Sequence, residues 1–240
     1  MRRNKRRSIS LIGLLFLLLI GGFRGNYKSV PIQVDKLLNQ EKTIKNSQRT
    51  EDIPIFDGEN YVVTVNKNVP SFTDKDLTIE SSGWQKFEDF DSLNRVGVAE
   101  AMLHKSMMPT ESRGDIQQVY PTGWQQKKIQ GKWLYNRSHL IAYQLTGEND
   151  NWKNLFTGTE QMNQWPMVKY ENKVANYLRA TNNHIRYRVN PRFHKNELVC
   201  RGVQVEAQSI EDNQLSFNVF IFNIEDEVTI DYATGQASKQ

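Results

Sequence analysis

The sequence contains only one cysteine, Cys200, among its 240 residues. An intramolecular disulfide is therefore impossible, and the fold must be stable without a covalent cross-link even if the protein is exported. Cys200 follows Leu198 and Val199 in a stretch typical of a β-strand. We expect it to pack in the core rather than to act as a nucleophile.

Zinc-binding patterns are also missing. The chain has no cysteine pair, and none of its four histidines has the i, i+4 partner found on zinc-binding helices. Internal repeats and low-complexity segments are absent too, which excludes a repeat architecture. At this length the chain has room for one medium-sized domain and a short appendage.

The first 25 residues differ in composition from the rest. Five cations among residues 2–7 precede an apolar run from Ile9 to Ile20, which only Ser10 and Gly13 interrupt. This is the layout of a secretory signal, and the cations argue against a buried helix. The run is short for a membrane span, which takes about 20 residues. No Ala-x-Ala cleavage site follows, so removal of the segment and its retention as a membrane anchor both stay open. We expect the protein to be secreted or held on the extracellular face of the membrane.

Residues 26–50 are polar and predict a linker, and residues 51–240 predict the folded domain. The formal net charge of +4 hides an uneven distribution. Residues 92–201 carry 16 Lys/Arg and 8 Asp/Glu, whereas the segments on either side of them in the domain are acidic. A polyanion would respond to this cationic segment rather than to the net charge, although ordinary solvated surface explains the charges equally well.

The pattern of residues predicts an α+β fold with a mixed or antiparallel central sheet and flanking helices. Helix formers ahead of Pro109 predict a helix over Leu93–Met108, and a second helix is expected over Pro166–Arg179 with Pro166 in its first turn. A polar loop is expected from Thr146 to about Gly158. The predicted strands are Tyr61–Val65, Trp133–Ile141, His184–Val189, Glu197–Gln208 and Leu215–Ile224.

The densest group of chemically useful residues begins at Asn136-Arg137-Ser138-His139. Strand alternation places Arg137 and His139 on one face, about 7 Å apart. A histidine with a pKa near 6.5 is substantially neutral at pH 7 and can take a proton from water. An arginine can hold a phosphate with two hydrogen bonds. This pair therefore indicates phosphodiester hydrolysis, whereas the other three histidines lack such neighbours.

Asn154, Asn163 and Glu171 follow at intervals of fifteen, nine and eight residues. Asn163 offers a neutral oxygen to Mg²⁺, which prefers to keep most of its water. On one regular helix, Asn163 and Glu171 would be about 12 Å and about 80° apart, too far to bind one ion together. We therefore assign Asn163 as the direct ligand. Glu171, on the apolar stripe of its helix, orients metal-bound water or pairs with Arg137; a buried structural salt bridge is the alternative.

These residues resemble the DNA/RNA non-specific endonuclease family of ββα-metal nucleases, whose Asp-Arg-Gly-His motif aligns with residues 136–139. Within that family, the chain is similar to bacterial secreted and surface DNases, including DNA-entry nucleases and streptodornases. This similarity covers most of residues 90–235. It includes Asn94-Arg-Val-Gly-Val-Ala, Leu145-Thr-Gly-Glu-Asn, Asn154-Leu-Phe-Thr-Gly-Thr and Ile230-Asp-Tyr-Ala-Thr-Gly.

The resemblance implies a strand–loop–helix active site and an endonuclease that depends on Mg²⁺, with Mn²⁺ as the alternative ion, and leaves 5′-phosphate ends. It implies His139 as the general base, Asn163 as the metal ligand, and Arg137, Asn154 and Glu171 in support. For the family's upstream phosphate-binding arginine, Arg113 is the first candidate and Arg95 the second.

Two positions depart from the family motif: Asn136 replaces Asp, and Ser138 replaces Gly. The histidine and arginine are intact, so the chemistry should survive, whereas residue 136 lacks the carboxylate that the family motif carries to orient the site. The expected substrate is DNA, with RNA as a second candidate, cut with little sequence preference. Two alternatives stay open: a surface protein that captures nucleic acid without cleaving it, and a phosphoesterase for small nucleotides.

Overall fold

The computed structural model describes residues 53–240. The expected leader over residues 1–25 and the linker over residues 26–50 lie outside these described residues. Within the described part, no helix combines the length and apolarity needed to cross a membrane.

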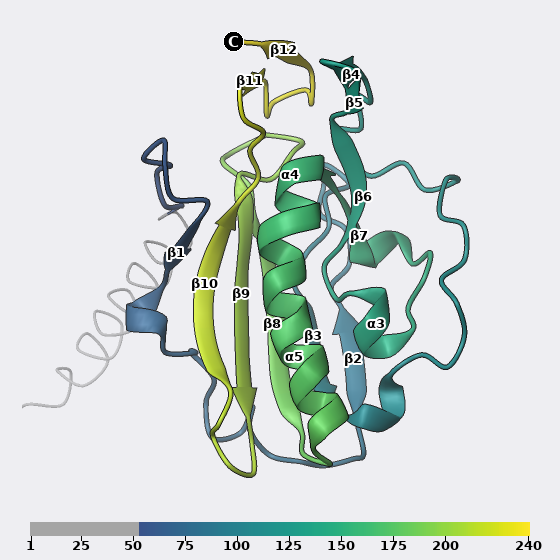
Figure 1. Cartoon of the computed structure of the whole chain (residues 1–240), viewed down its shortest axis with the longest axis vertical. Coiled ribbons are helices and arrows are strands. Elements are labelled where there is room, and N and C mark those ends of the chain that lie inside the picture. The colour runs from purple at the N-terminus through teal and green to yellow at the C-terminus, as the bar shows by residue number, and fades with distance from the viewer. Residues whose placement is uncertain (1–52) are drawn as a thin grey trace, which may run out of the picture. The chain divides into compact units, whose positions relative to one another are not determined.

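A six-stranded antiparallel sheet forms the centre of the domain (Figure 1). It confirms the predicted α+β class and the strands expected near the start and end of the domain. In spatial order its strands are β1 (Val62–Thr64), β10 (Ser216–Phe222), β9 (Gly202–Ser209), β8 (Ile185–Arg192), β3 (Ala99–Leu103) and β2 (Trp84–Phe87).

One face of this sheet is apolar and packs against the long helix α5 (Val168–Ala180), which lies in front of the strands and runs roughly along them in Figure 1. Alternate residues of each strand point to the same face, so every second residue enters this core. The helix contributes Val174, Ala175 and Leu178, all fully buried. The strands contribute Ala99, Ala101, Leu103, Ile185, Tyr187, Val189, Val203, Val205, Ala207, Phe217, Val219 and Ile221.

The opposite face of the sheet is charged. Glu100 on β3 accepts hydrogen bonds from Arg186 (2.9 Å) and Arg188 (2.7 Å) on β8, and Arg188 also contacts Glu206 on β9 (3.1 Å). The ring of Phe72 covers both guanidinium groups at 5.1 and 4.7 Å. Buried charges are stable only when paired and hydrogen-bonded, and this network meets that need for most of its groups.

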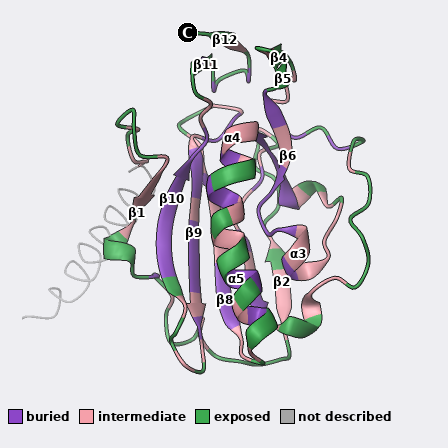
Figure 2. Ribbon diagram, in the orientation of Figure 1, coloured by how far each residue is buried: buried purple, intermediate pink, exposed green. Residues whose placement is uncertain are grey.

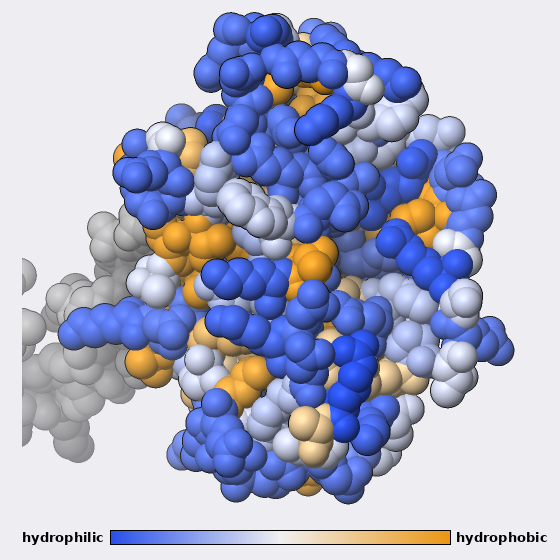
Figure 3. Space-filling model, viewed as in Figure 1, coloured by the Kyte–Doolittle hydropathy of each residue, from blue (hydrophilic) through white to orange (hydrophobic). Residues whose placement is uncertain are grey.

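A smaller unit lies beside the sheet. Strands β6 (Tyr135–His139) and β7 (Leu155–Thr159) pair antiparallel, and the segment between them contains helix α3 (Tyr143–Thr146) and the short helix η3 (Trp152–Asn154). Two short hairpins complete the domain: β4 (Lys128–Ile129) with β5 (Lys132–Trp133), and β11 (Val228–Ile230) with β12 (Ala237–Lys239). Figure 2 shows that burial concentrates in the central strands. On the face in Figure 3, apolar residues form only small, separate patches.

The helix predicted over Leu93–Met108 is wrong. This segment contains strand β3 and a short 3₁₀ helix, η2 (Lys105–Met107). Strand β3 is buried between β2 and β8, and Met102 on its other face is buried as well. An apolar run buried on both faces cannot be told from a helix by its period, and pairing with two neighbours overrides the helix propensity of its residues. The expected loop over residues 146–158 is also partly wrong, because its last residues form strand β7.

The second predicted helix is present but begins earlier. Helix α4 (Glu160–Met162) continues through a π-helical turn, η4 (Asn163–Met167), into α5. Pro166 therefore lies inside the π turn rather than in the first turn of the helix. A π turn is a common way for a helix to accommodate a proline, because the normal i to i−4 bond at that position is already lost.

Candidate active site

One cavity, of about 280 Å³, collects five of the six predicted site residues. Strand β6 supplies Arg137 and His139, the π turn supplies Asn163, helix α5 supplies Glu171, and the loop before β4 supplies Arg113. The strand pair β6–β7 followed by this helix is the strand–loop–helix unit that the sequence motif suggested.

His139 is 94% shielded from solvent, and its Nε2 lies 2.8 Å from the main-chain oxygen of Asn149. A carbonyl oxygen only accepts hydrogen bonds, so in the neutral ring Nε2 carries the hydrogen and Nδ1 can accept a proton. The pKa of His139 is lowered from 6.5 to about 4, chiefly by burial; the positive charge of Arg113 contributes to this shift, and the hydrogen bond to the carbonyl of Asn149 opposes it. The imidazole is therefore neutral at physiological pH, as a general base must be.

Glu171 and Arg113 carry opposite charges and lie in the same cavity, but they do not form a salt bridge. Burial raises the pKa of the Glu171 carboxyl from 4.5 to about 7, and the positive charge of Arg113 opposes this shift. Within residues 53–240, neither side chain makes a hydrogen bond or an ion pair shorter than 4.0 Å. A carboxylate and a guanidinium that share a cavity without closing on each other are both available to a ligand.

The π turn corrects the predicted geometry of Asn163 and Glu171. In a regular helix, eight residues would rotate one side chain from the other by about 80°. A π turn takes in one extra residue, so the effective step is seven residues and the rotation falls to about 20°. Both side chains accordingly line the same cavity. Sequence reasoning could not place the extra residue, although Pro166 marked the position.

Arg137 has a different set of contacts from the one predicted. Its Nη2 donates to the main-chain oxygen of Gln117 at 2.8 Å, and its Nε donates to that of Val119. The guanidinium also lies 4.3 Å from the ring centre of Trp124. The alternative in which Glu171 pairs with Arg137 is therefore wrong: Arg137 holds the 117–124 loop, and the cation whose charge reaches Glu171 is Arg113.

Asn154 is the predicted site residue that lies outside the cavity. It is fully buried, its Oδ1 accepts a hydrogen bond from the amide of Ile141 at 2.8 Å, and its Nδ2 donates to the carbonyl of Ile141 at 2.9 Å. These two hydrogen bonds fix the backbone at Ile141, two residues after His139. Arg95, the second candidate for the phosphate-binding arginine, is also outside; it is bound to Asp91 and to main-chain oxygens.

The two departures from the family motif occupy buried positions. Nδ2 of Asn136 and Oγ of Ser138 are both buried without a hydrogen-bond partner. Ser138 fits because Gly158 on β7 has no side chain; a Cβ there would lie 2.3 Å from Oγ and 2.9 Å from Cβ of Ser138. Neither residue lines the cavity of His139; both lie on the strand that carries it.

The residues present fit a hard divalent cation. The Asn163 carboxamide makes no hydrogen bond in the described part of the chain, and the nearby Glu171 carboxylate is half-buried without a partner. A cation would satisfy both, with water completing its shell, as Mg²⁺ prefers. Residues 53–240 contain no group of three His, Cys, Asp or Glu side chains suited to a metal. The donor set therefore does not resemble a closed structural zinc site.

A buried imidazole, a carboxamide, a carboxylate and an arginine surround one cavity on a strand–strand–helix unit, which is the arrangement that the resemblance to ββα-metal nucleases leads one to expect. Comparison with known proteins agrees. A family model described as DNA/RNA non-specific endonuclease matches residues 76–211, more than half of the sequence. The chain belongs to this family, which acts on nucleic acids.

Solved structures show the same fold. NucA from Streptococcus agalactiae, with a magnesium ion bound, is 26% identical, with a TM-score of 0.69 over 83% of this chain and 96% of that one. The Sda1 nuclease with a bound zinc ion is 24% identical, with a TM-score of 0.58 over 65% of this chain and 81% of that one. An extracellular endonuclease is 20% identical, with a TM-score of 0.56 over 77% of this chain and all of that one. The last two show likeness of fold alone.

Sequence reasoning missed the aromatic residues around Arg137. Tyr120 and Trp124 flank its guanidinium, at 5.3 and 4.3 Å from their ring centres. Their position before β4 carried no periodic signal. An aromatic-rich loop beside a cationic motif was the only available indication.

Proposed function

We propose that this chain is a Mg²⁺-dependent endonuclease that hydrolyses DNA, and RNA as a second substrate, outside the cell with little sequence preference. The observation that carries the proposal is the convergence of His139, Asn163, Glu171 and Arg113 on one cavity. These residues come from three separate parts of the chain.

His139 is the general base in this proposal. Its Nε2–H donates to the carbonyl of Asn149, which fixes the ring and leaves Nδ1 to take a proton from water. The water oxygen then bonds to phosphorus in line with the departing 3′ oxygen, and the bond from phosphorus to that oxygen breaks. The product strand keeps a 5′-phosphate.

Asn163 would hold the metal, with Glu171 orienting its water shell. When bound, Mg²⁺ supplies a Lewis acid that stabilises charge on the phosphate and on the leaving oxygen. Arg113 binds a non-bridging phosphate oxygen, because its guanidinium reaches the cavity without an internal partner. Arg137 and Asn154 position the strand and the loop that carry the base.

Location outside the cell is supported by the cationic and apolar leader. Two structural neighbours are also described as extracellular nucleases. Mass spectrometry of the natural N-terminus would show whether the leader is removed or retained as an anchor.

The test is DNA cleavage by purified protein in Mg²⁺, with an EDTA control. His139→Ala should lower the rate by about 10²- to 10⁴-fold, the usual contribution of a general base. His194→Ala is the matched control, because its side chain is 54% exposed and does not line the cavity. Near-normal cleavage by His139→Ala would remove the mechanism, and DNA binding without cleavage by the wild type would favour the capture alternative.

A further inference from the structure

A second hollow, of about 470 Å³, opens beside the candidate active site. We call it the aromatic pocket; its lining includes Gln117, Tyr120, Trp124, Trp133, Asn136 and Arg137. Arg137 lines both this hollow and the cavity of His139, so its side chain forms part of the wall of each. A ligand held in the aromatic pocket would therefore lie next to the site of hydrolysis.

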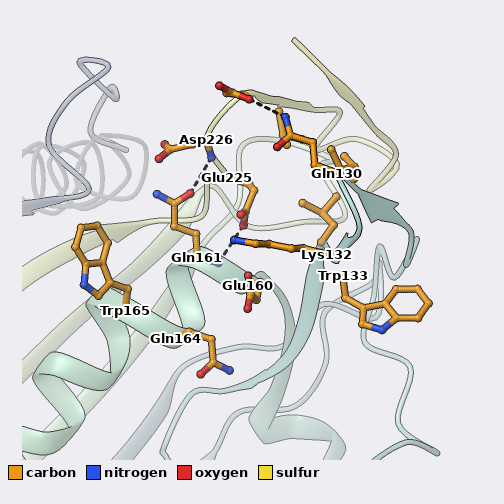
Figure 4. Close-up of a pocket in the computed structure, with 13 residues that line it drawn as sticks. Gln130, Lys132, Trp133, Glu160, Gln161, Gln164, Trp165, Glu225 and Asp226 are labelled. Atoms are coloured by element: carbon orange, nitrogen blue, oxygen red, sulfur yellow. Dashed lines mark hydrogen bonds between the residues drawn. The ribbon is translucent and has the colours of Figure 1, made fainter.

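Two of the four aromatic side chains that line this pocket are exposed. Tyr120 is 62% exposed and Trp133 is 55% exposed, although burying large rings is strongly favourable. Figure 4 shows the neighbouring acidic cavity, and the Trp133 ring points away from its carboxylates, Glu225 and Asp226. The ring is thus presented outward, where the β4–β5 hairpin borders the aromatic pocket.

Cations accompany these rings. The guanidinium of Arg137 lies 4.3 Å from the centre of Trp124 and 5.3 Å from that of Tyr120. The ammonium of Lys128 lies 4.9 Å from the centre of Trp133. Such contacts hold the rings in fixed orientations and set positive charge beside each one. Aromatic faces alternating with positive charge match a nucleotide strand, whose bases are flat and whose phosphates are anionic.

Two carboxamide side chains in the wall of the pocket are suited to contacting the edge of a base. The side chains of Gln117 and Asn136 make no hydrogen bond among the described residues. Carboxamides can both donate to and accept from the edge of a base. Of the two, the exposed Gln117 can do this for any base, since its carboxamide can present either its oxygen or its nitrogen, whereas Nδ2 of Asn136 is buried.

We propose that the aromatic pocket is a base-stacking subsite that binds unpaired nucleotides next to the bond being cut. In a duplex the base faces are stacked inside the helix, so only single-stranded or locally opened nucleic acid offers them to Tyr120 and Trp133. The protein therefore prefers single-stranded segments, without reading sequence. This inference rests on the proposed nuclease function and names the form of its substrate.

The test is binding measured by fluorescence anisotropy in EDTA, so that nothing is cleaved. The probes are a labelled oligothymidylate, a strand of the same length and charge with abasic sites, and a duplex. Tyr120→Ala and Trp133→Ala should each weaken binding of the oligothymidylate by about 5- to 100-fold, the range for one stacked base. Binding of the abasic strand should stay unchanged. Trp152→Ala is the matched control, because this tryptophan is 49% exposed and does not line the pocket.

Equal losses on the abasic strand, or no loss on the oligothymidylate, would overturn the proposal. So would wild-type protein that binds the duplex more tightly than the single strand at the same salt concentration. Urea midpoints of the variants should match the wild type, since both rings are exposed. Cleavage in Mg²⁺ is scored separately: a protein that binds through the rings but never cuts refutes the nuclease function and leaves the subsite standing.

Discussion

The burial of His139 predicts a specific dependence of folding stability on pH. Its pKa falls from 6.5 in the unfolded chain to about 4 in the folded protein, mainly through loss of solvent. Between these two values the unfolded chain binds a proton at this imidazole and the folded chain does not. Acidification through this window therefore favours unfolding.

The size of the effect follows from the two pKa values. At pH 5 the loss in free energy of unfolding is about 2 kcal/mol, and at pH 4 it is about 3 kcal/mol, relative to pH 8. Glu171 has the opposite effect, because its pKa is raised from 4.5 to about 7 and the folded protein holds an extra proton between those values. The contribution of His139 must therefore be measured as a difference between the wild type and a variant.

His139→Gln is the suitable variant, since a carboxamide can still donate to the carbonyl of Asn149 but does not titrate. Urea unfolding of both proteins in EDTA, followed by circular dichroism from pH 8 to pH 4, gives the two stability curves. The difference in free energy of unfolding between the wild type and the variant should fall on acidification, by about 2 kcal/mol between pH 8 and pH 5. Parallel curves would show that His139 keeps a normal pKa and that its neutrality does not come from burial.

Three further predictions concern residues around the base. Asn163→Ala should abolish cleavage at Mg²⁺ concentrations that saturate the wild type, and chelation with EDTA should do the same to the wild type; an unchanged Mg²⁺ titration for the variant would place the ligand elsewhere. Asn154→Ala should lower the free energy of unfolding by about 2–4 kcal/mol, because it leaves the buried amide and carbonyl of Ile141 unpaired; a urea midpoint like that of the wild type would contradict this. Gly158→Ala should cost about 1–3 kcal/mol through overlap with Ser138, and Ser138→Gly should restore most of the loss in the double variant; additive costs in the double-mutant cycle would show that the two sites are independent.

The sequence predicted most strands and a set of residues of which five line one cavity, but it did not predict the contacts that each residue makes. Strand alternation correctly placed Arg137 and His139 at one cavity, because a period of two depends only on local backbone geometry. The motif spacing also led to Asn163 and Glu171. The helix prediction over Leu93–Met108 was wrong because the structure of this segment depends on its pairing with two neighbouring strands.

The remaining errors have the same origin. Treating residues 163–171 as a regular helix separated Asn163 from Glu171, whereas the π turn places both at the cavity. The contacts of Arg137 with Gln117 and Val119 join positions 18 to 20 residues apart along an irregular loop. Neither feature has a period that a sequence could display, so only the folded chain reveals that Arg137 is bound to main-chain oxygens while Arg113 lines the cavity.

The charged face of the central sheet has a consequence for partly opened forms of the molecule. The segment that carries Ser71 and Phe72 covers the charged side chains of Glu206, Arg186 and Arg188. If this segment detaches, water reaches ion pairs that hydrate readily, while the apolar core on the other side stays closed beneath α5. Such an opening exposes mainly charged groups that water can solvate, and it leaves the main hydrophobic core covered.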